Sequence, residues 1–435
     1  MTRALLKLAQ QREIMVASVV ASTIAACGAR AFADVTVIQR SGGAPIVGPS
    51  AVATEQGVEV AATGGALSGK ALVPWDMVRA VEGTPAVARL DELGAPAEDL
   101  WRARIRIDRG DDDLALPLLR AHWDRFAATD GPTTALVAEG MLRATMARGD
   151  ARGAFEPWIV CLRLGARNVQ SRFPNAEPVL DATTGFLPAL PPFVPSKDRE
   201  SLALACDAVS ESMAGSEALP VARIFAAIVR ATAFDARPDA AASSALLPNG
   251  AVLPSADVLS LVLAIIAAEN DRERATVVAQ FERAVAQAPG YLGAWKLAAI
   301  GMNASLRARA IPEGDANRAP ALERAALELL AVPASELDPT GLVDCFALEE
   351  ASRLLRDAGD PTAADQLKNV LEERSRKLAA RITTRVSARE VTPEMKSETT
   401  PVAGSSSAQI HRSAVNTSQA SLSAPRDGYA GRSEP

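Results

Sequence analysis

One short pattern, repeated between predicted helices, constrains the fold of this chain more than any other feature. It consists of a Gly-Asp pair followed by an alanine five residues after the glycine, and it occurs at Gly110-Asp111 with Ala115, Gly149-Asp150 with Ala154, and Gly359-Asp360 with Ala364. Glycine readily adopts the left-handed conformation that closes a helix, and aspartate can cap the helix that follows. Alanine allows two helices to approach closely. Each copy therefore predicts a turn between two packed helices.

A second segment combines bulky, small and proline residues at a fixed spacing. Phe281, Ala284 and Pro289 are followed six residues later by Trp295. The bulky residue is expected to fill the groove between hairpins, the small residue to let two helices approach, and the proline to end the helix. The tryptophan would then dock on the preceding hairpin. All four positions match the tetratricopeptide pattern, so the segment resembles that repeat.

The Gly-Asp turns also resemble the turn inside a tetratricopeptide hairpin. The first two copies are 39 residues apart, whereas the usual repeat is 34 residues long, which indicates longer loops. Residues 173–196 contain too many prolines for a helix or a central strand. We predict a packed connector there, with a partner-binding polyproline segment as the alternative. Residues 95–390 are therefore expected to form an interrupted tetratricopeptide-like α-α solenoid of four to six hairpins.

Residues 34–84 differ from the helical region in pattern. Short runs of alternating or β-branched residues, such as those beginning at Val35, Gly57 and Ala71, are separated by glycine-containing turns. The segment closes with the pattern Pro-Trp-Asp-x-Val-Arg-x-Val-Glu, from Pro74 to Glu82, which resembles small β-barrel or meander modules at the start of exported bacterial proteins. We predict a small β-barrel or β-meander module of four or five strands.

Residues 1–33 have the features of a signal peptide. Basic residues precede a largely apolar stretch from Ile14 to Ala26, and Ala31 and Ala33 provide small residues before a cleavage point. The stretch is shorter than the roughly 20 residues that span a bilayer. Export to the periplasm or cell envelope is therefore expected. A second interpretation is that Ile24 to Cys27 forms a lipobox, so that Cys27 becomes lipidated and anchors the protein in a membrane.

The C-terminal residues and the overall charge narrow the possible partners. Residues 391–435 are rich in Ser, Thr, Ala and Pro, a composition that predicts a disordered tail. The formal net charge of −6 and the absence of a long basic run argue against nucleic-acid binding. A protein or peptide of unknown identity is the expected partner, with membrane attachment only if Cys27 is lipidated.

Few residues are suited to catalysis or metal binding. Of the two histidines, His411 lies in the predicted tail, and His122 is expected to be a partly buried helix residue. The cysteines after residue 33, namely Cys161, Cys206 and Cys345, lack metal-ligand or redox spacing and are predicted to be buried packing residues. The cluster from Asp108 to Asp113 lacks the glutamate that completes a calcium loop, so we interpret it as a solvated turn. No catalytic residue, cofactor or metal site is predicted.

The leading hypothesis is a non-enzymatic protein-protein interaction scaffold in the bacterial envelope. One alternative is a structural or tethering envelope protein that is lipid-anchored at Cys27. The other is an enzyme of unrecognised type with its site between the β-module and the first hairpin.

Overall fold

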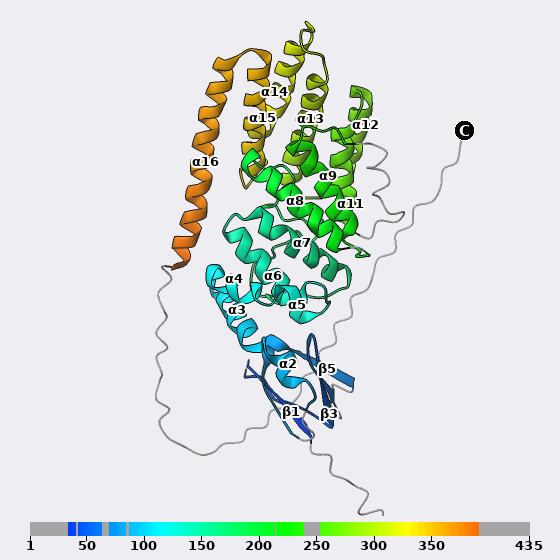
Figure 1. The fold of residues 1–435 in the computed structure, drawn as a ribbon, viewed down its shortest axis with the longest axis vertical. Coiled ribbons are helices and arrows are strands. Elements are labelled where there is room, and N and C mark those ends of the chain that lie inside the picture. Colours follow the sequence, from blue (N-terminus) through cyan, green and yellow to red (C-terminus); the bar gives the residue numbers. More distant parts are fainter. Residues whose placement is uncertain are drawn as a thin grey trace, which may run out of the picture. The chain divides into compact units, whose positions relative to one another are not determined.

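The protein is mainly helical, with a small antiparallel β-module at its N-terminal side (Figure 1). The computed structural model describes residues 34–40, 42–62, 69–83, 87–213, 215–238 and 253–390. The predicted signal peptide, with Cys27, and the predicted disordered tail lie outside the described residues. Most of the predicted module and most of the predicted helical region lie within them.

The described part of the β-module forms two three-stranded antiparallel sheets. One has the order β2-β1-β6 and the other β3-β4-β5. The strands are β1 (Val35–Gln39), β2 (Ile46–Gly48), β3 (Ser50–Thr54), β4 (Gly57–Ala62), β5 (Gly69–Pro74) and β6 (Val78–Glu82). Buried valines such as Val37, Val58 and Val73 form the core of the module.

Two details of the module differ from the prediction: the barrel alternative and the number of strands. Neither sheet closes into a barrel within the described residues, whereas β3, β4 and β5 follow one another as a meander. The described residues contain six strands instead of four or five. The residues between Ala71 and Gly83 form two strands, because the short 3-10 helix η1 (Trp75–Met77) separates β5 from β6.

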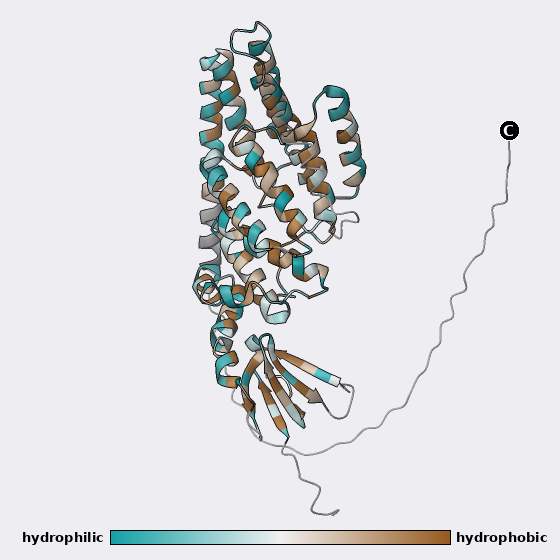
Figure 2. Ribbon diagram, turned by 45° about the vertical axis from the view of Figure 1, so that its right-hand side comes forward, coloured by the Kyte–Doolittle hydropathy of each residue, from teal (hydrophilic) through white to brown (hydrophobic). Residues whose placement is uncertain are grey.

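The first part of the helical region packs in chain order. Neighbouring elements contact each other along α3, α4, α6 and α7; the short helix α2 precedes α3, and the short helix α5 lies between α4 and α6. The bounds are α2 (Leu90–Gly94), α3 (Ala97–Arg109), α4 (Asp112–Arg120), α5 (Trp123–Phe126), α6 (Pro132–Ala147) and α7 (Ala151–Ala166). Figure 2 shows that individual helices carry both hydrophobic and hydrophilic residues, the pattern that lets one face pack while the other is solvated.

In the second part of the helical region, helices that are close in the chain again pack against each other. Helices α8 and α9 pack together, α11 contacts α9, α12 and α13, and α13 to α16 each pack on the next. The bounds are α8 (Ser196–Ser212), α9 (Leu219–Ala233), α11 (Pro254–Ala267), α12 (Asp271–Ala284), α13 (Tyr291–Arg309), α14 (Arg318–Ser335), α15 (Leu342–Ala358) and α16 (Pro361–Glu390).

The connector between α7 and α8 has no helix or strand, and much of it is buried. The Phe186 ring centroid lies 6.4 Å from that of Trp158 on α7 and 5.0 Å from that of Trp295 on α13. Further along, Phe193 contacts Phe346 of α15, with ring centroids 5.3 Å apart. Because its aromatic residues pack between helices distant in the sequence, the connector is part of the hydrophobic core.

Candidate functional site

The three Gly-Asp turns have the same backbone geometry. Gly110, Gly149 and Gly359 have φ values of 81°, 68° and 93°, in the left-handed region. In each turn the aspartate N–H donates to the carbonyl oxygen five residues earlier, over 2.8, 3.0 and 2.9 Å respectively. The alanines of the pattern, Ala115, Ala154 and Ala364, are fully buried.

The aspartates of these turns precede the next helix in each case. The Oδ1 atom of Asp150 accepts the N–H of Gly153 over 2.8 Å, and that of Asp360 accepts the N–H of Ala363 over 2.9 Å. Asp111 occupies the same position before α4 but makes no such side-chain hydrogen bond. Two of the three turns therefore include the side-chain cap that the sequence suggests.

The segment from Phe281 to Trp295 is arranged differently from the prediction. Phe281 is fully buried, but Ala284 is exposed, so it does not provide a close helix contact. Helix α12 ends at Ala284, five residues before Pro289, and its C-cap is Val285. Phe281 is the one fully buried residue of this helix, which leaves Ala284 on its solvent side. Trp295 is buried; its ring packs edge-on against Tyr291 and at a steep angle against the connector residue Phe186.

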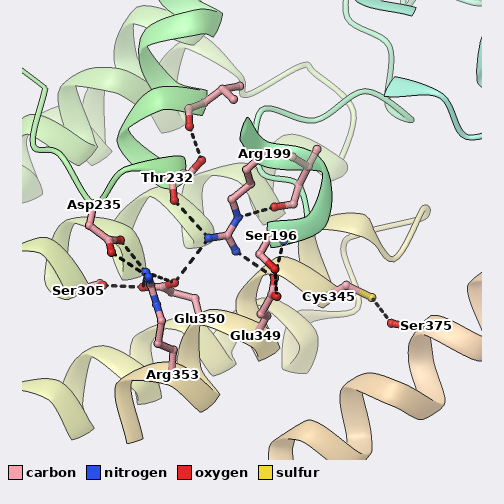
Figure 3. A network of polar contacts seen from close by, with 12 residues as sticks. Ser196, Arg199, Thr232, Asp235, Ser305, Cys345, Glu349, Glu350, Arg353 and Ser375 are labelled. Carbon is pink, nitrogen blue, oxygen red and sulfur yellow. Dashed lines mark hydrogen bonds and ion pairs between the residues drawn. The ribbon is translucent and has the colours of Figure 1, made fainter. Parts of the chain in front are cut away.

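A polar network joins four parts of the helical body around Glu350 (Figure 3). Glu350 on α15 is 1% exposed. Its carboxylate accepts a hydrogen bond from Ser305 over 3.0 Å and forms ion pairs with three arginines: Arg353 at 2.7 Å, Arg309 at 3.0 Å and Arg199 at 3.8 Å. Ser305 and Arg309 belong to α13, and Arg199 belongs to α8.

Two more carboxylates complete this network. Asp235, which follows α9, pairs with Arg309 and Arg353, each over 2.6 Å. Glu349 pairs with Arg199 over 3.2 Å and accepts the backbone N–H of Ser196 over 2.7 Å. Burial lowers the pKa of Arg199, an effect opposed by the charges of Glu350 and Glu349. Opposite charges are thus matched within the network, whose evident role is to join α8, α9, α13 and α15.

A second buried charge lies between the β-module and the helices. Asp76 in η1 is fully buried and accepts hydrogen bonds from Arg104 of α3, over 2.8 Å, and from Arg172, over 2.9 Å. Trp75, also fully buried, packs near Gly94 of α2. These side chains fill part of the boundary between the β-module and the helices, where the enzyme hypothesis put an active site.

A pocket of about 400 Å³ lies at the edge of the module, between β1, β6 and α2. Its polar lining consists of Glu82, Arg89, Asp91 and Glu92. Arg89 and Glu92 form a 2.8 Å ion pair, and this hydrogen bond lowers the pKa of Glu92. The described lining contains no Cys, His, Ser or Lys, and its groups able to transfer a proton are the carboxyls of Glu82, Asp91 and Glu92.

His122 and the aspartate cluster have structural partners. His122 lies in the turn between α4 and α5, so the prediction of a helix residue was wrong, and its Nε2 is 3.2 Å from Asp99 Oδ2. Asp113 pairs with Arg148. Asp112 is buried, which corrects the interpretation of the whole cluster as solvated. Within the described residues, no three His, Cys, Asp or Glu side chains are grouped to hold a metal ion.

The three described cysteines are not paired with one another. Cys206 and Cys345 are buried and Cys161 is partly buried. In all three, burial raises the thiol pKa above its ordinary value, which disfavours the reactive thiolate.

The sequence patterns did not single out Arg199 or Glu350. A single arginine or glutamate within a predicted helix is a weak signal, because most such residues are solvated. Within the described part of the chain, no helix combines the length and apolar character needed to cross a membrane. Comparisons with protein families, curated proteins and solved structures found no match to this chain.

Proposed function

We propose that the protein is a non-enzymatic interaction scaffold of the bacterial envelope whose helical hairpins form a tetratricopeptide-like solenoid. The observation that carries the proposal is the turn geometry shared by Gly110, Gly149 and Gly359, which reverses the chain between packed helices each time. Succession of such hairpins is how solenoids build extended binding surfaces.

Exposed apolar side chains on separate helices supply contact points for a protein or peptide partner. The exposed fractions are 55% for Leu114 on α4, 63% for Leu204 on α8, 57% for Phe234 after α9, and 69% for Leu327 on α14. Removing exposed apolar side chains from water is the main favourable contribution to most protein association. We therefore expect substitution of several of these residues to weaken partner binding without disturbing the hydrophobic core.

The test is cross-linking and affinity purification of the full chain from the organism that produces it. A triple variant, Leu204→Ser, Phe234→Ser and Leu327→Ser, should lose a protein that the unmodified chain enriches. A matched control, Glu200→Gln, Glu211→Gln and Glu323→Gln, changes exposed polar residues and should retain that protein. A folded chain that enriches no specific protein, or one that the apolar triple variant retains equally, would count against the proposal.

A further inference from the structure

Helix α6 begins without a capping side chain of its own. The N-cap position is Gly131, which has no side chain, and the first helical residue is Pro132, which has no N–H. The first N–H groups that need a partner outside the helix are therefore those of Thr133 and Thr134. Both threonines are fully buried, so water does not replace a missing cap there.

The missing cap is supplied by Gln56, in the turn between β3 and β4. Its Oε1 atom accepts the N–H groups of Thr133 and Thr134, each over 3.0 Å. Its Nε2 atom donates to the Oγ1 atoms of Thr129 and Thr134, each over 2.9 Å. The backbone carbonyl oxygen of Gln56 also accepts the hydroxyl of Thr133 over 2.6 Å. Both polar atoms of the glutamine side chain are thus engaged at the start of α6.

The glycine at the N-cap position fits this arrangement. A Cβ atom placed on Gly131 would lie 2.6 Å from both Cγ and Oε1 of Gln56, closer than such atoms can approach. The φ of Gly131 is 143°, which also disfavours other residues. An ordinary capping residue at this position and the observed placement of Gln56 therefore exclude one another.

Trp75 and Asp76 hold the same end of the module in place. The Nε1 atom of Trp75 donates to the carbonyl oxygens of Thr54 and Glu55, over 3.1 Å each, in the turn that carries Gln56. The backbone N–H of Trp75 donates to Thr133 Oγ1 over 3.3 Å. Asp76 is held by arginines of the helical body. The turn between β3 and β4 and the helix η1 therefore form one surface that packs against the helices.

We propose that Gln56 is a conformational lock that makes the β-module the cap of helix α6, so that undocking of the module unwinds the first turn of that helix. The lock couples the β-module to the helical body through a carboxamide that is specific in both its donor and its acceptor atoms. This proposal stands independently of the proposed scaffold function.

The test is native-state hydrogen exchange of the full chain carrying Gln56→Met, which keeps the length of the side chain but removes its polar atoms. Amide exchange at residues 133–137 should become about fivefold to thirtyfold faster, the factor that corresponds to losing a helix cap. Exchange in α13 should stay unchanged. The control is Gln39→Met, which removes an exposed hydrogen bond from the same module and should leave α6 unaffected.

Two further variants keep the test decisive if Gln56→Met does not fold. Gln56→Glu retains an acceptor oxygen for the N–H groups of α6 but lacks the Nε2 donor, so it should restore only part of the protection. Thr129→Val removes one acceptor of Nε2 and should accelerate exchange at the same residues by a smaller factor. Unchanged protection of α6 in both Gln56→Met and Thr129→Val, or equal acceleration throughout the helical body, would overturn the proposal.

Discussion

At the residue scale, α14 lies so close to Gly301 on α13 that this position has no room for a side chain. A Cβ atom on Gly301 would lie 2.7 Å from the side chain of Leu329 and 3.0 Å from its backbone Cα. Gly301→Ala is therefore expected to destabilise the protein by about 1–3 kcal/mol, as other overpacked cores do. Urea unfolding of the variant and the unmodified chain measures this difference.

Gly165 near the end of α7 is the matched control for this substitution. A Cβ atom added there would meet no atom within 4 Å. Alanine should be neutral or stabilising by up to about 1 kcal/mol, because it is the better helix former. If both alanine variants lost the same stability, close packing would not be the reason for the glycine at 301.

Glu156 gives the stability a predictable dependence on pH. Its carboxylate accepts a 3.0 Å hydrogen bond from Trp123 Nε1, but burial is the larger effect and raises its pKa above the ordinary value of 4.5. Because the pKa is raised in the folded state, the contribution of this group to stability is present below the unfolded pKa. That contribution is lost as the pH rises through the pKa that Glu156 has in the folded protein.

We therefore expect Glu156→Gln to be least stable, relative to the unmodified protein, at acidic pH. The difference should shift in favour of Glu156→Gln as the pH rises past the ordinary glutamate range. Urea unfolding of both proteins at a series of pH values measures this difference. A difference that does not vary with pH would contradict the argument.

At the scale of elements, α12 is held less firmly than its neighbours. Its one fully buried residue is Phe281, whereas α11 and α13 bury many. Ion pairs join it to adjacent helices, including Arg274 with Glu328 of α14 over 2.8 Å and Glu282 with Lys296 of α13 over 2.7 Å. Such pairs near the surface are weakened by salt.

Amide exchange in residues 271–284 should therefore be faster than in α13 and should accelerate further when ionic strength rises from about 0.1 M to about 1 M. Hydrogen-exchange mass spectrometry at the two salt concentrations tests this expectation, with α13 as the internal control. Equal rates in α12 at both concentrations would show that packing of Phe281 alone holds the helix.

The network around Glu350 is expected to be the most sensitive charged cluster among the described helices. Glu350→Gln keeps the shape of the side chain but leaves Arg199, Arg309 and Arg353 without their shared buried carboxylate. Leaving a buried charge without any partner typically costs about 3–5 kcal/mol. Because Asp235 and Glu349 still pair with these arginines, thermal and urea unfolding should show a clear loss of stability that is smaller than this.

Glu373, in an exposed pair with Lys377 on α16, provides the comparison. Glu373→Gln should leave unfolding unchanged within error, because exposed ion pairs contribute little. A similar loss of stability in both variants would mean that burial does not distinguish the two sites.

At the scale of the whole molecule, the first residue of the mature protein distinguishes a released protein from one that is anchored in a membrane. When the full chain is produced in an exporting bacterial host, we expect the mature protein to begin at Asp34, after removal of residues 1–33. Intact-mass spectrometry of the purified protein tests this. A mature chain that begins with an acylated Cys27 would support the tethering alternative, and an uncleaved chain would contradict export.

Much of the fold could be predicted because it depends on local patterns. A helical body, a small β-module and the Gly-Asp turns at residues 110, 149 and 359 follow from periodicity and from the conformational freedom of glycine. The junction at Phe281 was less predictable. Ala284 is exposed because another face of α12 meets the neighbouring helices, and spacing alone does not determine which face that is.

The sequence by itself determined the elements and several of the turns that connect them, because these depend on residues close together in the chain. The tertiary structure decided which distant polar groups meet. Gln56 caps α6 by binding Thr133, which lies 77 residues later in the chain. Glu350 pairs with arginines of α8, α13 and its own helix α15. Such contacts leave little trace in a local pattern, since a buried polar group needs a partner from anywhere in the chain that can satisfy it.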